Sequence, residues 1–140
     1  MLNRATRYAI KSLVIIAKDS SGLPVTIASI AGQLNISAKF LEAIVRDMRI
    51  AGFVKSQKGS AGGYKLAKAA SDIKLSAIVR ALNGPIALAP CVSLNFYEPC
   101  EICPDENACE LHHVLAKVRD ASLAIMETTS LADLAGKTVK

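Results

Sequence analysis

The segment ISAKFLEAIVRDMRIAGFVKSQKGSAGGYKLA, residues 36–67, decides the fold. Its first half places apolar side chains three and four residues apart, which predicts a helix over 38–51 with one buried face. Ser37 suits the N-cap of this helix, and Gly52 stands where a left-handed residue would end it. The second half has two short alternating stretches around a Gly-rich tip, which predicts a β-hairpin.

Helical patterns flank this segment on both sides. Before it, the spacing of apolar residues predicts helices over 4–18 and 27–34, and the tight turn Asn35-Ile36-Ser37 leads into the next helix. After it, we expect a helix over 75–82, an irregular stretch with three prolines, a long helix over 110–128 and a short one over 131–134. The fold class that follows is mainly α with a small β-hairpin wing.

Charge is distributed unevenly along the 140 residues. Residues 1–80 carry 13 Lys and Arg against 4 Asp and Glu, whereas residues 81–140 carry 4 against 8. A basic half favours a polyanionic partner, usually nucleic acid, although a solvated basic surface would look the same. A DNA-binding motif is therefore expected in the basic half.

Composition restricts the class of protein. Hydrophobic residues make up 51% of the chain and Trp is absent, so a packed core is expected and it must be aliphatic. No apolar run approaches the roughly 20 residues of a membrane span, and the N-terminus lacks the pattern of a signal peptide. We expect a cytoplasmic protein with no membrane partner, in which thiols stay reduced.

A helix, a tight turn, a second helix and a basic hairpin form the order of a winged helix-turn-helix. The outward face of the second helix would meet the major groove of double-stranded DNA, and the glycines of the hairpin would let its backbone approach phosphates or the minor groove. The DNA-binding residues expected on this reasoning are Lys39, Glu42, Arg46 and Arg49 on the helix, and Lys55, Lys58, Gly59, Gly62 and Gly63 on the wing.

All four cysteines and both histidines of the chain lie within residues 91–113. Their spacing is Cys91-x8-Cys100-x2-Cys103-x5-Cys109-x2-His112. In a reducing compartment such a cluster favours metal ligation over disulfides, and thiolates suit both iron–sulfur clusters and zinc. We predict a metal or cluster site in a loop that has little apolar core of its own.

Several motifs resemble the Rrf2 family of bacterial winged-helix regulators. They are Arg7-Tyr8-Ala9, Ile36 to Glu42, Gly52-Phe53-Val54 and, most specifically, the wing Lys58 to Ala67. The resemblance extends from Arg4 to about Gly136. It implies a homodimer that binds an operator, with the wing in the minor groove and the second helix in the major groove, and it adds Ser37, Phe40 and Tyr64 to the expected DNA contacts.

The long helix over 110–128 carries an apolar seam with a 3-4-3-4 spacing, formed by Leu111, Val114, Val118, Ala121 and Ile125. The spacing alone fits a partner helix or an ordinary core-facing stripe. The resemblance implies that this helix makes the dimer. The expected organisation is a DNA-binding domain at 1–85, a cluster-binding loop at 86–109, and a dimerisation helix with a C-terminal tail at 110–140.

The resemblance to the cysteine-containing branch of the family implies an iron–sulfur cluster, either 2Fe–2S or 4Fe–4S. Cys103 and Cys109 match the last two of three ligands, and the first is Cys91 or Cys100, with Cys91 favoured. His112 resembles a fourth ligand, a place that Cys100 could also take. The implied function is a repressor whose operator binding follows iron–sulfur or iron status, redox state or nitric oxide.

The cysteine segment is also compatible with other functions. The site could be structural zinc, since Cys100-x2-Cys103 has zinc-like spacing, or the regulator could respond to a partner protein or a small sulfur metabolite. A thiol oxidoreductase using this CxxC is disfavoured, because the pair lies in a Pro-rich loop and not at the start of a helix in a βαβ unit. We therefore do not expect an enzyme.

Overall fold

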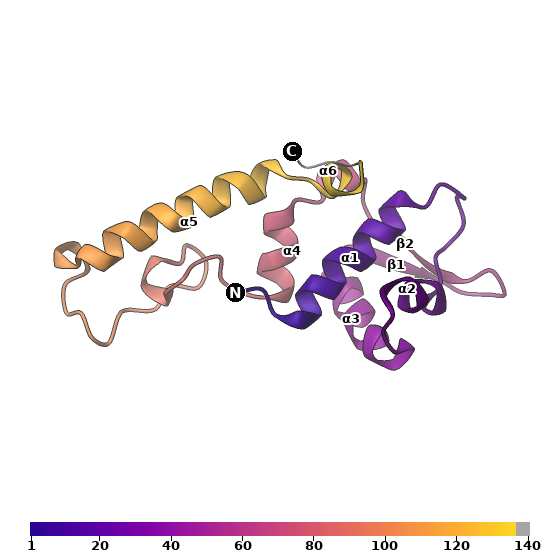
Figure 1. Ribbon diagram of the computed structural model, residues 1–140, viewed down its shortest axis with the longest axis horizontal. Coiled ribbons are helices and arrows are strands. Elements are labelled where there is room, and N and C mark those ends of the chain that lie inside the picture. The colour runs from indigo at the N-terminus through magenta and orange to yellow at the C-terminus, as the bar shows by residue number, and fades with distance from the viewer. Residues whose placement is uncertain (137–140) are drawn as a thin grey trace.

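The computed structural model describes residues 1–136, so the last four residues of the expected C-terminal tail lie outside it. The elements in chain order are α1 (Arg4–Lys18), α2 (Ile27–Leu34), α3 (Ala38–Ile50), β1 (Val54–Gln57), β2 (Gly63–Leu66), α4 (Leu75–Leu82), α5 (Glu110–Thr128) and α6 (Leu131–Gly136), with short 3₁₀ turns η1 (Ala70–Asp72), η2 (Pro90–Val92) and η3 (Glu106–Ala108) (Figure 1). The predicted fold class, helices around a small β-hairpin, is confirmed.

Side-chain caps start the first three helices. The Oδ1 of Asn3 accepts from the Thr6 amide, and hydroxyls of Thr26 and Ser37 do the same for α2 and α3. Each cap satisfies an amide that the helix itself cannot pair. At the far end of α3, Gly52 adopts φ 83°, the left-handed conformation expected from the sequence.

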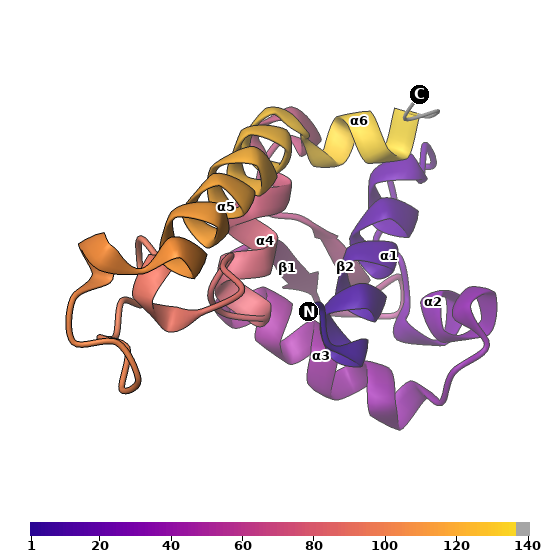
Figure 2. The ribbon, with the colours of Figure 1, turned by 60° about the vertical axis from the view of Figure 1, so that its left-hand side comes forward.

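An aliphatic core joins α1, α2, α3, the first strand and the C-terminal helix. Leu13, Ile30, Leu41 and Met48 are fully buried in it. Leu131 of α6 is also fully buried in this core, and its amide donates to the Ile73 carbonyl at 2.7 Å. Figure 2 shows α6 beside α1, so the chain returns to the winged domain after α5.

The wing is an antiparallel pair in which Val54 faces Leu66 and Gln57 faces Gly63. It is anchored to the segment before α2, because Val25 and Tyr64 exchange backbone hydrogen bonds of 2.8 and 2.9 Å. A Cβ at Gly63 would lie 2.6 Å from the Val25 carbonyl oxygen. Glycine at this position therefore lets the wing backbone approach the body of the domain.

Helix α5 extends away from the winged domain, with the cysteine loop along its N-terminal end (Figure 1). Its C-terminal end is tied to α4, because the Leu75 amide donates to the Thr129 carbonyl and Arg80 pairs with Glu127 at 3.2 Å. None of the described helices is both long enough and apolar enough to cross a membrane.

Candidate DNA-binding face and cysteine loop

Helix α3 is divided into a buried and an exposed face. Leu41, Ile44, Val45 and Met48 pack into the core. The opposite face is open to solvent and carries the side chains predicted to meet DNA, namely Lys39, Glu42, Arg46 and Arg49. The only ion pair found for these cations among residues 1–136 joins Arg46 to Asp47 at 3.9 Å, with both side chains over 60% exposed. Such a pair contributes little and leaves Arg46 available to a phosphate or a base.

The N-terminal end of α3 is packed against α1. Ser37 is exposed and uses its hydroxyl to cap the helix. The ring of Phe40 meets the ring of Tyr8 edge-on at 5.7 Å, and the Arg4 guanidinium lies 5.5 Å from the Phe40 centroid. Phe40 therefore links the predicted recognition helix to the first helix of the chain.

The wing places most of its predicted residues at the surface. Lys55, Lys58 and Gly59 are exposed, and Gly62 and Gly63 are half-buried at the start of the return strand. Tyr64 is also half-buried and packs against the core, which is a structural role that the motif alone does not reveal. The direct DNA contacts of the wing remain a prediction.

The four cysteines are half-buried and unpaired within the loop that precedes α5. Cys91 lies in η2, and the thiol of Cys103 donates to the Asp105 carbonyl at 3.2 Å. Cys109 is the N-cap of α5, where its sulfur accepts from the His112 amide at 3.4 Å. Cys91 thus lies within one short turn, and Cys109 stands between η3 and the first turn of α5.

The thiols influence one another electrostatically. Burial raises the pKa of the Cys91 thiol, and charge on Cys100 raises it further. Burial also raises the pKa of Cys103, followed by a hydrogen bond to Cys109 and the charge of that group. In each case burial is the larger cause and the neighbouring thiol is a smaller one.

His112 has a ring nitrogen without a partner. Its Nδ1 is buried and forms no hydrogen bond with the described residues, whereas Nε2 of the exposed His113 lies 3.0 Å from the Asn107 carbonyl. A buried imidazole nitrogen normally has a partner or a metal. Within residues 1–136, however, no three Cys, His, Asp or Glu side chains are arranged to hold one metal ion. The donor types fit a cluster or zinc, but the loop must rearrange to bind either.

Two contacts of the cysteine loop were not predicted from the sequence. Arg119 of α5 reaches back 27 residues, and its Nη1 donates to the Val92 carbonyl at 2.6 Å. The Tyr97 hydroxyl donates to Glu106 at 2.8 Å and closes the loop on itself. No periodicity or motif marks such pairs, because each depends on how an irregular loop folds back.

The predicted seam of α5 lies on its exposed face. Leu111, Val114 and Ile125 are between 57% and 66% exposed, Val118 is 40% exposed, and Ala121 is exposed as well. The same helix buries only Leu123. An apolar stripe of this kind indicates a contact surface and not a core-facing stripe.

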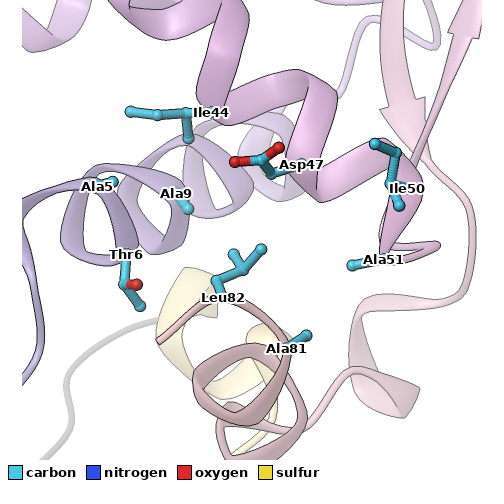
Figure 3. Close-up of a pocket in the computed structure, with 9 residues that line it drawn as sticks. All are labelled: Ala5, Thr6, Ala9, Ile44, Asp47, Ile50, Ala51, Ala81 and Leu82. Atoms are coloured by element: carbon cyan, nitrogen blue, oxygen red, sulfur yellow. The ribbon is translucent and has the colours of Figure 1, made fainter. Parts of the chain in front are cut away.

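A cavity of about 340 Å³ lies between α1, α3 and α4 (Figure 3). Its lining is mostly small and apolar, with Ala5, Ala9 and Leu82 among the residues, and Asp47 supplies its one carboxylate. The Thr6 hydroxyl at its edge is buried and unpaired among the described residues. The lining contains no cysteine, histidine or basic side chain, so this cavity is separate from the cysteine loop.

Comparison with known proteins identifies the class. A family model described as Rrf2, Iron-dependent Transcriptional regulator, matches residues 2–137. An rrf2-like HTH-type transcriptional regulator of Rhodobacter capsulatus is 39% identical over 137 residues, which cover 96% of this chain and 91% of that protein.

Solved structures give the same result. The structure of CymR, the global cysteine regulator of B. subtilis, is similar with a TM-score of 0.79 and 32% identity, over 96% of this chain and 95% of that one. The IscR of T. potens is similar with a TM-score of 0.74 and 26% identity, over 96% and 85%. The chain belongs to the Rrf2 family of winged-helix transcriptional regulators.

Proposed function

We propose that this chain is a homodimeric repressor that binds a double-stranded DNA operator under the control of an iron–sulfur cluster in the cysteine loop. The observation that carries the proposal is that the predicted cluster ligands adjoin the predicted dimerisation helix. Four free thiols lie within residues 91–109, the unpaired Nδ1 of His112 lies in the first turn of α5, and the apolar face of this helix is exposed. The last of these thiols, Cys109, is the N-cap of α5, so two of the predicted ligands stand where the predicted dimerisation helix begins.

Cys91, Cys103 and Cys109 would hold the cluster, with His112 or Cys100 as the fourth ligand. A bound cluster, 2Fe–2S or 4Fe–4S, would supply sensitivity to iron supply, oxidants or nitric oxide. Thiolates are the ligands that such clusters prefer, and the buried imidazole nitrogen has no other partner among residues 1–136. Some of these donors have partners within the loop, as when the Cys103 thiol donates to the Asp105 carbonyl.

The state of the loop can reach α5 by two contacts. Cys109 caps the helix through the His112 amide, so a change at its sulfur alters the first turn of α5. Arg119 holds the Val92 carbonyl, one residue from Cys91, so a shift of that turn pulls on the middle of the helix. Both ends of the predicted ligand set are thus attached to α5.

DNA binding follows from the exposed face of α3 and from the wing. In a dimer formed through the seam of α5, two recognition helices read two half-sites at a fixed separation. A small rotation of α5 against the winged domains changes that separation, and specific binding is lost. Lys39, Arg46 and Arg49 would contact phosphates or guanine edges, and Glu42 could accept from a cytosine amino group.

The first experiment is to purify the protein without oxygen and record its visible absorption, with analysis of iron, acid-labile sulfide and zinc. We expect a coloured protein that contains iron and sulfide. Binding to an operator selected from a random duplex library is then measured before and after removal of the cluster. Equal affinity in the two states would contradict the control mechanism, even if the cluster is present.

The ligand set is assigned with single substitutions to alanine. Cys103→Ala and Cys109→Ala should abolish the visible absorption, and Cys91→Ala should do so if it is the first ligand. Cys100→Ala is the matched control, since it removes a neighbouring thiol that we place outside the set of three. Loss of colour in Cys100→Ala with colour retained in Cys91→Ala would reverse that assignment.

A second candidate function is supported by the likeness to CymR, whose structure is described as that of a global cysteine regulator. In this case the regulator responds to a sulfur metabolite or a partner protein, and the loop is a structural zinc site or holds no metal. A colourless protein with stoichiometric zinc, or with no metal, would favour it. The operator affinity would then be measured with and without free cysteine.

A further inference from the structure

The exposed face of α1 carries four basic side chains, three of them within its first eight residues. Arg4, Arg7, Lys11 and Lys18 fall within an arc of about 60°, at 100° per residue, and the buried side chains of α1 lie on the opposite side. The helix contains no acidic residue. None of these cations was among the DNA contacts expected from the sequence.

This arrangement is unfavourable for an isolated helix. Arg4 and Arg7 stand in the first turn, where the helix dipole favours negative charge. Arg7 and Lys11 are four residues apart, a spacing at which like charges repel. Among residues 1–136, no carboxylate lies within ion-pair distance of Arg4, Arg7 or Lys11. A bound anion would offset both the repulsion and the dipole.

The basic face of α1 also has a defined shape at its N-terminal end. The Arg4 guanidinium is held at 5.6 Å from the Tyr8 ring centroid and 5.5 Å from that of Phe40, within the range of cation–π contacts. A cleft of about 250 Å³ is lined by Arg4, Arg7, Tyr8 and Lys11. Three cations and a phenol therefore surround one hollow that is large enough for a phosphate group.

We propose that this α1 cleft is a phosphate-binding site for the DNA backbone that flanks the bases read by α3. The proposal rests on the proposed function, because it presumes that α3 docks on DNA. Phe40 connects the α1 cleft to α3. Its ring contacts both Arg4 and Tyr8, and the residue stands in the first turn of α3. A duplex against the start of α3 would bring a phosphate to Arg7 and Lys11.

A second copy of the chain is the competing occupant. Residues 98–110 include five acidic side chains and no basic one, so the cysteine loop of a partner subunit would also suit a cationic cleft. The contact between Phe40 and Arg4 favours DNA, because it places the cleft next to the predicted DNA-binding face. The experiment below separates the two occupants.

The test compares Arg7→Gln, Lys11→Gln and the double variant with wild type, using the full-length protein. Lys117→Gln is the matched control, because it removes one charge from an exposed position on α5. Binding to a random-sequence 40-base-pair duplex and to the selected operator is measured by fluorescence anisotropy from 50 to 200 mM salt. Dimer dissociation is measured for each protein by sedimentation.

We expect the double variant to lose about tenfold in affinity for both duplexes at 100 mM salt. The negative slope of log affinity against log salt should become less steep by about 1.8, because two phosphate contacts are lost and each contributes about 0.9. Lys117→Gln should leave the slope unchanged. If the double variant keeps the wild-type slope, or weakens only the dimer, the proposal is wrong. Wild-type protein that binds neither duplex would instead overturn the proposed function.

Discussion

The winged domain and the cysteine loop are held together by different forces. In the winged domain, α1 to α3 bury a continuous aliphatic core, and Leu131 returns from the far end of the chain to complete it. In residues 86–109 only Val92 and Ser93 are buried, and Leu88, Leu94 and Ile102 point into solvent. Single hydrogen bonds between side chains and backbone hold the loop in place.

This difference indicates which region is rigid in every state and which region would depend on a ligand for its order. The core fixes the position of α3 and the wing regardless of any ligand, because hydrophobic burial is available in every state. The loop has few contacts of its own, so a ligand held by its thiols would add a large share of its order. Under the proposed function, the DNA-binding face would stay rigid while the loop responds to its ligand.

Leu41→Ala should produce the largest loss of stability, and it tests whether the aliphatic core holds the winged domain together. The side chain is fully buried, so its truncation should lower the free energy of unfolding by about 2–5 kcal/mol. Urea denaturation followed by circular dichroism measures the change. Glu42→Ala, on the exposed face of the same helix, and Ile102→Ala, 92% exposed in the loop, should each change it by less than about 0.5 kcal/mol. A comparable loss in Ile102→Ala would mean that the loop shares the core.

The first region could be predicted in detail from the sequence. The spacing of Leu41, Ile44 and Met48, the cap at Ser37 and the glycine at position 52 each reflect local physics that the chain itself encodes. The helix that carries the α5 seam was also predicted, whereas the use of the seam in a dimer stays a prediction. Local periodicity is sufficient here because the buried faces are regular.

The loop could be predicted only by its chemistry. The sequence predicts Cys91, Cys103 and Cys109 as donors, but it does not place them, because an irregular loop has no repeating pattern. The contact between Arg119 and Val92 and the return of α6 to the core depend on long-range packing. The basic face of α1 was visible in the sequence, but its cleft depends on Phe40 from another helix.

Gly63→Ala should have the next largest effect, and it tests whether the wing belongs to the rigid region. The added Cβ would lie 2.6 Å from the Val25 carbonyl oxygen, so either the wing or the segment before α2 must shift. We expect a loss of about 2 kcal/mol in the free energy of unfolding and weaker binding to duplex DNA. Ser60→Ala at the exposed tip is the control and should leave stability unchanged. Wild-type stability in Gly63→Ala would show that the wing is only loosely attached.

Arg119→Ala should loosen the loop without affecting the core. The side chain is 16% exposed and donates to the carbonyl of Val92, a buried residue, so its loss leaves that acceptor unpaired at a cost of about 1–3 kcal/mol. We expect faster amide exchange and proteolysis within 86–109, with an unchanged rate in α3. Asp120→Asn removes the ion-pair partner of Arg119 but keeps the bond to Val92, and it should behave as wild type. If the loop of Arg119→Ala is as well protected from exchange and proteolysis as the wild-type loop, this contact does not link the loop to α5.

Asp133→Asn should have the smallest effect, and it tests the local contacts at the start of α6. The Asp133 carboxylate accepts from the Ser130 amide at 2.8 Å and from the Ser130 hydroxyl at 2.7 Å. These bonds lower the pKa of Asp133. A lowered pKa stabilises the folded state above the ordinary pKa of an aspartate, about 3.9, and this contribution disappears as the pH falls through the folded value. Asparagine keeps an acceptor but no charge, so we expect Tm to fall by about 2 °C at pH 7. The difference in Tm from wild type should vanish below the folded pKa of Asp133. A difference in Tm that persisted there would mean that the Ser130 contacts do not act through the carboxylate charge.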